Sequence, residues 1–225
     1  MLKVTHEVWT TKYSILQNLP KLLKNHGLLS FDIETRSVYD QQARKQAKDY
    51  ISTNPPIDEE YREAMLANES SGLSCPAIIK TTHFIFGITN THSVIVICRD
   101  SELENTIWKL VSEYQGTLLV HNSLFDLKVM DFRGYGYPKN VIDTALLAKC
   151  LINHVDTYKA KVGLKVLVGD LYKPSWALYD EYEVDNYNDP KFIEYCAIDG
   201  AATIKLWELL QIECTKHEGN QGILL

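Results

Sequence analysis

The sequence predicts an α/β fold, in which a mixed sheet of about five strands is flanked by helices and a helical insertion follows the first strand. Short apolar runs bounded by polar turns predict the strands, and segments with helical spacing alternate with them in the second half of the chain. The chain has 225 residues, of which 45% are hydrophobic and 23% charged. These values are typical of a single domain that buries its own core.

The predicted strands are short. The first, Leu28–Glu34, follows a break at Gly27 and becomes polar at its end. The next two have the pattern of a hairpin, because apolar runs flank the polar turn Thr89–His92. The two hairpin strands are His83–Ile88 and Ser93–Ile97, and the last two predicted strands are Thr117–Val120 and Val141–Asp143.

Helical patterns occupy the segments between and after these strands. Apolar residues recur with helical spacing near Glu102–Tyr114, and a helix is expected over Thr144–Ile152. Asn122 is a plausible N-cap for a helix after the fourth strand. Pro190 is expected in the first turn of a long C-terminal helix, where its fixed φ is favourable.

A polar stretch from Ser37 to about Pro76 interrupts the pattern after the first strand. It contains two helix-like pieces, near Asp40–Tyr50 and Ile57–Asn68, separated by an Asn-Pro-Pro sequence. We interpret residues 37–76 as an insertion and residues 216–225 as a short tail of a single domain spanning 1–225.

Composition limits the class of protein. The five cysteines are scattered without a Cys-x-x-Cys pair, which indicates reduced thiols rather than a disulfide framework or a zinc site. No apolar segment reaches the roughly 20 residues of a membrane span, and no signal region is visible at the N-terminus. We therefore expect a cytoplasmic protein. The net charge of −6 disfavours a broad basic surface for nucleic acid.

Acidic residues occur at three places that suit metal chemistry. Asp32 and Glu34 are two apart on a strand, so their side chains emerge on the same face. Asp126 falls in the first turn of a helix, and Tyr195 and Asp199 are stacked at i and i+4 on another. Carboxylates in apolar surroundings need a neutralising partner, and hard oxygen ligands suit Mg²⁺ or Mn²⁺. Each motif alone also has an ordinary explanation. Asp-x-Glu is usually surface charge, Asp126 suits the first turn of any helix, and Tyr195 with Asp199 is a common contact at a helix edge.

Together, the three motifs Phe-Asp-Ile-Glu-Thr, His-Asn-x-x-Phe-Asp and Tyr-x-x-x-Asp resemble the DEDDy group of 3′→5′ exonucleases. This group has a ribonuclease H-like fold, and the likeness is strongest to the proofreading domain of family A DNA polymerases. The Asp-Thr sequence at Asp143 and the Leu-Lys-x-Leu sequence within Gly163–Val168 are similar to further elements of that family. The resemblance covers roughly residues 27–210, apart from the insertion.

The resemblance implies a two-metal hydrolysis of phosphodiesters at the 3′ end of DNA. Asp32, Glu34 and Asp199 would hold one divalent ion, while Asp32 and Asp126 would serve the second. Tyr195 would orient the attacking water. The residues expected at the terminal nucleotide are Thr35, Asn122 and Phe125.

The chain departs from the family in two respects. Family A domains connect their first two strands tightly, whereas residues 37–76 intervene here, and the chain ends soon after the third motif. We therefore expect a free-standing exonuclease, of bacterial or phage origin, or a separately encoded proofreading subunit with a DNA polymerase as partner. The C-terminal sequence Gln221–Leu225 loosely resembles a motif that binds the sliding clamp.

Two other functions stay open at this point. The substrate could be RNA, as in ribonuclease D-like enzymes of the same group, because discrimination depends on contacts to the 2′-hydroxyl. Alternatively, the chain could be a non-catalytic module that binds nucleic acid or a polymerase. No metal ligand of the motif is missing, which favours the enzyme.

Overall fold

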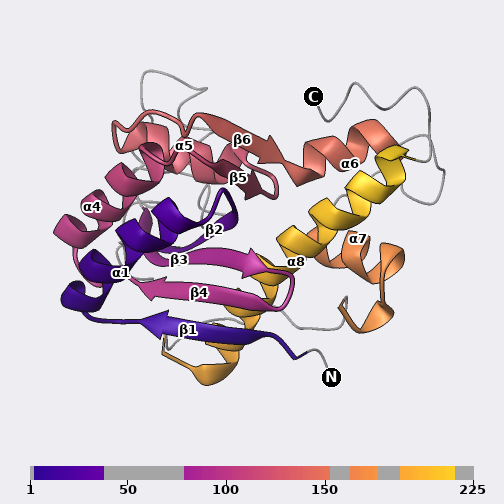
Figure 1. The fold of residues 1–225 in the computed structure, drawn as a ribbon. Coiled ribbons are helices and arrows are strands. Elements are labelled where there is room, and N and C mark those ends of the chain that lie inside the picture. Colours follow the sequence, from indigo (N-terminus) through magenta and orange to yellow (C-terminus); the bar gives the residue numbers. More distant parts are fainter. Residues whose placement is uncertain (1–2, 38–78, 153–162, 177–187, 216–225) are drawn as a thin grey trace, which may run out of the picture.

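A computed structural model describes residues 3–37, 79–152, 163–176 and 188–215. Its centre is a mixed sheet with the strand order β1-β4-β3-β2-β5-β6 (Figure 1). Strands β2, β3 and β4 are antiparallel neighbours, whereas β1 pairs with β4, β5 with β2, and β6 with β5 in parallel. The strands are β1 (Thr5–Trp9), β2 (Leu28–Ser37), β3 (Ile79–Thr89), β4 (His92–Ile97), β5 (Thr117–Val120) and β6 (Asn140–Asp143).

Helices cover both faces of the sheet. One face packs against α1, α4 and α5 around a core that includes Phe31, Phe84 and Trp108. The other face packs against α8, which α6 and α7 flank (Figure 1). The helices are α1 (Lys12–Asn25), α4 (Ser101–Ser112), α5 (Leu124–Phe132), α6 (Thr144–Ile152), α7 (Leu164–Leu171) and α8 (Pro190–Thr215), and a 3₁₀ turn, η3 (Pro174–Trp176), follows α7.

The α/β prediction is confirmed, with corrections at the N-terminus. The five predicted strands correspond to β2 through β6, and the described part of the chain has a sixth, β1, at the edge of the sheet. The sequence analysis missed β1 because most of its side chains are exposed, so it lacks the apolar pattern of a buried strand. It also missed α1, which contains Pro20 and begins at the N-cap Thr11, whose side chain accepts a hydrogen bond from the Ser14 amide.

The prediction that Asn122 caps α5 is wrong. Ser123 occupies the N-cap position and makes no capping hydrogen bond with its side chain. Asn122 instead has a positive φ of 64° and forms the sharp turn between β5 and α5. The other predicted helix starts agree with α6 and α8.

Several predictions fall outside the described residues. These are the helix-like pieces of the 37–76 insertion and the C-terminal tail 216–225 with its clamp-like sequence. Of the cysteines in the described ranges, Cys98, Cys196 and Cys214 are buried and Cys150 is exposed, and none of the four is in a disulfide. None of the helices searched in these ranges is long and apolar enough to cross a membrane.

Helix α8 lies unusually close to the sheet where it crosses β2 and β3. The buried Ser30 hydroxyl on β2 donates to the carbonyl of Gly200 on α8 at 2.6 Å, and accepts from the Gly87 amide on β3 at 3.0 Å. A Cβ atom at Gly87 would collide with both Ser30 Oγ and the Gly200 carbonyl. Glycine is therefore required at this crossing, and the crossing fixes the depth at which α8 sits on the sheet.

We expect Gly87→Ala to lower the free energy of unfolding by about 1–3 kcal/mol, because the added methyl group has no space at this contact. Urea unfolding followed by circular dichroism measures the change. Gly27→Ala is the matched control, since a Cβ there meets nothing within 4 Å. Equal stability of Gly87→Ala and the wild type would show that α8 does not depend on this close approach.

Candidate active site

Strand β2 presents two carboxylates toward α8. Phe31 and Ile33 alternate with Asp32 and Glu34 along the strand, and the two apolar side chains enter the core beneath α1 and α4. Asp32 pairs across the sheet with Ile85, whose side chain packs against α8. Both acids therefore lie on the α8 face, as the two-residue spacing predicts.

Helix α8 brings a third carboxylate to the same place. One ligand oxygen from each of Asp32, Glu34 and Asp199 lies within 4.8 Å of the others. Asp199 is buried, with 6% of its surface exposed, and the residue that follows it is Gly200, at the close crossing of α8 and the sheet. The cluster is compatible with a metal-binding active site, because three converging carboxylates form a set of hard oxygen donors.

Asp126 lies beside this cluster in the first turn of α5. Its side chain is buried, and its Oδ1 atom has no hydrogen-bond partner in the described structure. Asp126 is not part of the group of three, but the charge of Asp32 acts on it. A buried carboxylate oxygen without a donor is costly, so this atom also fits a site that receives a cation.

Asp143 at the end of β6 fixes the loop that leads to Asp126. Its Oδ2 accepts from the Ser123 amide and hydroxyl, each at 2.8 Å, and its Oδ1 accepts from the Asn122 amide at 3.1 Å. It also accepts from the Ala145 amide in the first turn of α6 at 2.9 Å. Burial raises the pKa of Asp143, but these hydrogen bonds outweigh it and lower the pKa overall. An ionised Asp143 thus holds the start of α5 against α6.

The crowding of acids perturbs their titration. Burial, followed by the charge of Asp199, raises the pKa of Asp32 to about 7, although the Ile33 amide donates to it at 2.9 Å. Burial and the charges of Asp32 and Asp199 raise the pKa of Glu34 well above its usual range. Burial, and then Asp32, does the same to Asp126. Without a cation the site therefore favours protonated carboxyls at neutral pH.

Tyr195 stands at the edge of the cluster in an aromatic and cationic setting. Its hydroxyl is hydrogen-bonded to Asp199, and burial with the neighbouring carboxylates raises the pKa of the phenol far above 10. One ring face stacks on Phe192 with centroids 5.9 Å apart. The Lys165 ammonium from α7 lies 4.5 Å from the ring centroid, and its charge lowers the pKa of Glu34.

A pocket of about 500 Å³ lies beside Asp32, Tyr195 and Asp199, which form part of its wall. Asn122, one of the residues expected at the terminal nucleotide, is in its lining. Phe125 instead packs, partly buried, against the core beneath α1 and α4, and Thr35 is half-buried beside a bulge in β2. Within the described ranges neither lines this pocket, whose walls include Asp32, His121, Asn122, Lys165, Tyr195 and Asp199.

Sequence reasoning assigned no role in the site to two residues that shape it. Lys165 entered that reasoning only as part of the Leu-Lys-x-Leu sequence, and Asp143 only in the Asp-Thr sequence at the end of a predicted strand. Their positions in motifs of the resembled family were the available signal. Their contacts could not be derived, because both act across segments distant in sequence.

No protein-family model and no curated protein sequence matches this chain. Solved structures do. Brucella melitensis NrnC with bound Mg²⁺ superimposes with a TM-score of 0.57 and 16% identity, over 98% of this chain and 85% of that one. The Aedes aegypti Nibbler EXO domain superimposes with a TM-score of 0.56 and 11% identity, over 94% of this chain and 89% of that domain. Escherichia coli RNase D, an exoribonuclease involved in structured RNA processing, superimposes with a TM-score of 0.53 and 14% identity. The match covers 93% of this chain and 45% of the RNase D chain.

These identities are low, so the similarity concerns the fold. The six-stranded mixed sheet between two helical layers matches the architecture of these nucleases. The expectation of a ribonuclease H-like fold is therefore confirmed, with the acidic cluster on its central strand and on the helix that crosses it.

Proposed function

We propose that this protein is a metal-dependent 3′→5′ exonuclease that releases nucleoside 5′-monophosphates from DNA. The convergence of Asp32, Glu34 and Asp199 within 4.8 Å carries the proposal. Asp199 is buried and Asp32 and Glu34 are half-buried, and such a group of carboxylates destabilises a protein unless cations neutralise it. Cations there would face a pocket large enough for a nucleotide. The fold shared with RNase D supports the same class of reaction.

The carboxylates divide between two ion positions. Asp32, Glu34 and Asp199 would hold one Mg²⁺ or Mn²⁺ ion, and Asp32 with Asp126 would serve a second. Such ions supply charge that stabilises the attacking and leaving oxygens of a phosphodiester displacement. The unpartnered Oδ1 of Asp126 supports its inclusion, although that residue lies outside the group of three.

Tyr195 acts as a hydrogen-bonding group. Because the pKa of its phenol is raised, the hydroxyl keeps its proton and cannot serve as a general base. It can donate to or accept from a water that approaches the scissile phosphate, while Phe192 on one side of the ring and Lys165 near its face hold the orientation. The Lys165 charge also keeps Glu34 more acidic than burial alone would.

The terminal nucleotide would occupy the pocket beside Asn122. The positive φ of Asn122 and the hydrogen bond of its amide to Asp143 fix this loop. Thr35 and Phe125 remain proposed contacts of the same nucleotide. Phe125 would have to leave its packing against the core to stack on a base, so its contribution depends on that movement.

RNA is the alternative substrate. The His121–Asp126 and Gly163–Val168 sequences support DNA through their likeness to proofreading domains, whereas the structural similarity to RNase D supports RNA. As a DNA enzyme the protein would proofread or process ends in replication as a single domain in the cytoplasm. A separately encoded polymerase, and a sliding clamp bound through Gln221–Leu225, are the partners we propose for that role.

Removal of divalent ions should abolish hydrolysis, because the carboxylates alone would repel a phosphodiester. Asp32→Ala and Asp199→Ala should each remove nearly all activity, and Tyr195→Phe should leave a reduced but measurable rate. Release of mononucleotides from a labelled single strand measures all three. Asp131→Asn, an exposed acid on α5, is the control and should match the wild type. Hydrolysis by chelated Asp32→Ala would refute the assignment.

The substrate is decided by time courses on DNA and RNA strands of matched sequence, together with paired and mispaired DNA termini. A proofreading enzyme should degrade single-stranded and mispaired DNA at least about tenfold faster than RNA, since a site built around one sugar discriminates against the other. The reverse preference would assign the protein to RNA processing.

The raised carboxyl pKa values link stability to pH. The folded pKa of Asp32 is about 7 against an ordinary value of 3.8. The contribution of protonated Asp32 to the free energy of unfolding is therefore complete below about pH 4. It is lost as the pH rises through about 7. In chelator, Tm should fall between pH 5.5 and 8.5, and added Mg²⁺ should raise Tm most at pH 8.5, where the ligands are ionised.

Asp32→Asn tests this linkage, because its side chain is neutral at every pH. The variant should be more stable than the wild type in chelator at pH 8.5, and Mg²⁺ should raise its Tm less. Asp131→Asn again serves as the exposed control. If Mg²⁺ raised the Tm of both variants equally, the cluster would not be the ion site.

A further inference from the structure

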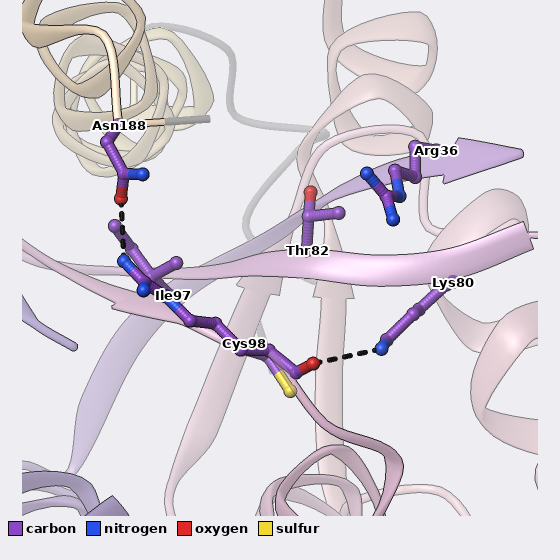
Figure 2. A pocket seen from close by; sticks show the side chains of 7 residues that line it. Arg36, Lys80, Thr82, Ile97, Cys98 and Asn188 are labelled. Atoms are coloured by element: carbon purple, nitrogen blue, oxygen red, sulfur yellow. Dashed lines mark hydrogen bonds between the residues drawn. The ribbon is translucent and has the colours of Figure 1, made fainter. Parts of the chain in front are cut away.

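A second pocket, with basic walls, lies at the ends of β2, β3 and β4 (Figure 2). Its volume is about 220 Å³. Asn188, just before α8, stands on one side of it, with Arg36 and Lys80 on the other and Thr82 between them (Figure 2). The described residues that line it are Arg36, Lys80, Thr82, Ile97, Cys98, Arg99 and Asn188.

Three cationic side chains share this small space, and no acid is among the described residues lining it. The Lys80 ammonium donates to the backbone carbonyl of Arg99 at 3.1 Å, and the Arg99 guanidinium donates to Asn188 Oδ1 at 3.0 Å. Both partners are neutral, so they orient these charges without cancelling them. Burial raises the pKa of Cys98 to about 12, so its thiol adds no negative charge. The charges of Glu104 and Asp100 also reach the Cys98 thiol, but neither residue lines the pocket. Among its described lining residues the charged side chains are all cationic, in a chain of net charge −6.

The pocket adjoins the acidic cluster. Arg36 follows Glu34 by two residues on β2, a distance of about 7 Å along a strand. The Thr82 hydroxyl, which lies in the pocket wall, donates to the Glu34 carbonyl at 3.0 Å. From Thr82 a hydrogen bond leads to His83, whose ring meets Phe192 edge-on at 5.0 Å, and Phe192 stacks on Tyr195. The basic pocket and the acidic cluster are thus held in a fixed relation.

The lining indicates which part of a nucleic acid would enter. Among the described residues it contains no aromatic side chain on which a base could stack. Arginine, lysine, threonine and asparagine together are the donors typical of contacts to phosphate oxygens. Such contacts fix the position of a strand without reading its sequence.

We propose that the Arg36–Lys80–Arg99 pocket binds a phosphate of the substrate strand on the 5′ side of the scissile bond. The inference rests on the exonuclease function proposed above, because it assumes that the 3′ end lies at the acidic cluster. The bound phosphate anchors the strand while the terminal nucleotide is removed, so the pocket sets affinity and the carboxylates set the chemical rate. The anchored group is either an internal phosphodiester or the 5′-terminal phosphate of a very short strand.

The test neutralises two of the cations. In full-length chain carrying Asp32→Ala, we expect Lys80→Gln with Arg99→Gln to weaken binding of a labelled single strand about tenfold or more, measured by fluorescence anisotropy in Mg²⁺ buffer. The slope of log affinity against log salt should become shallower by about 0.7 for each lost phosphate contact. The matched control is Lys24→Gln with Lys109→Gln, two exposed lysines on α1 and α4 that do not line the pocket.

In the active chain the same double variant should raise KM with kcat within about twofold of the wild type, as expected for loss of uniform binding. Single neutral methylphosphonate linkages placed along the strand, and dinucleotides with or without a 5′-phosphate, locate the bound group. A methylphosphonate at the anchored linkage, or removal of an anchored 5′-phosphate, should weaken binding to the wild type. The same change in the strand should not weaken binding to the double variant any further.

Equal affinity, salt slope and KM for the double variant, its control and the wild type would overturn the phosphate site, whatever the wild type hydrolyses. A wild type that hydrolyses no strand would instead refute the proposed function. In that case, binding that still depended on Lys80 and Arg99 would show a phosphate site in a non-catalytic protein.

Discussion

The close crossing of α8 over the sheet is the constraint on which the acidic cluster depends. Two of its carboxylates belong to β2 and the third to α8, so their separation is set by how deeply the helix lies. Glycines at positions 87 and 200 remove the side chains that would hold the two layers apart, and the Ser30 hydroxyl bridges both backbones. A polar group buried this deeply is stable only because it is fully bonded. The fold thus uses backbone contact to bring distant acids together.

That convergence works against stability in the protein without metal. Asp32, Glu34 and Asp126 all have raised pKa values, chiefly because burial disfavours their charged forms. Folding therefore forces together groups that an unfolded chain would leave apart and hydrated. The fold nevertheless holds these carboxylates in place before any cation binds. A cation would then bind preformed ligands, and the side chains would need little reorganisation. The Lys165 ammonium offsets only part of the repulsion, from one side.

Much of this arrangement could be predicted from sequence, for identifiable reasons. The spacing of Asp32 and Glu34 predicted a common face because strands alternate strictly, and Tyr195 and Asp199 followed from helical periodicity. The cap at Asn122 was wrong because the turn there is held by Asp143 from another strand, which no local pattern reveals. The edge strand β1 carries too little apolar pattern to be detected. Likewise, the basic pocket gathers Arg36, Lys80 and Arg99 from three separate strand ends, so no spacing in the sequence predicts it.

The distribution of charge within the molecule bears on how an acidic chain could bind the polyanionic substrate that we propose. A net charge of −6 argues against a broad nucleic-acid surface, and the described structure does not need one. Charges close to a phosphate act on it far more strongly than the net charge of the distant parts of the chain, because solvent and salt screen interactions beyond about 10 Å. A strand that spans the two pockets would meet cations at Lys80 and Arg99 and metal-bound carboxylates at its 3′ end. Because the chain as a whole carries net negative charge, these two places would favour a strand end that reaches both of them.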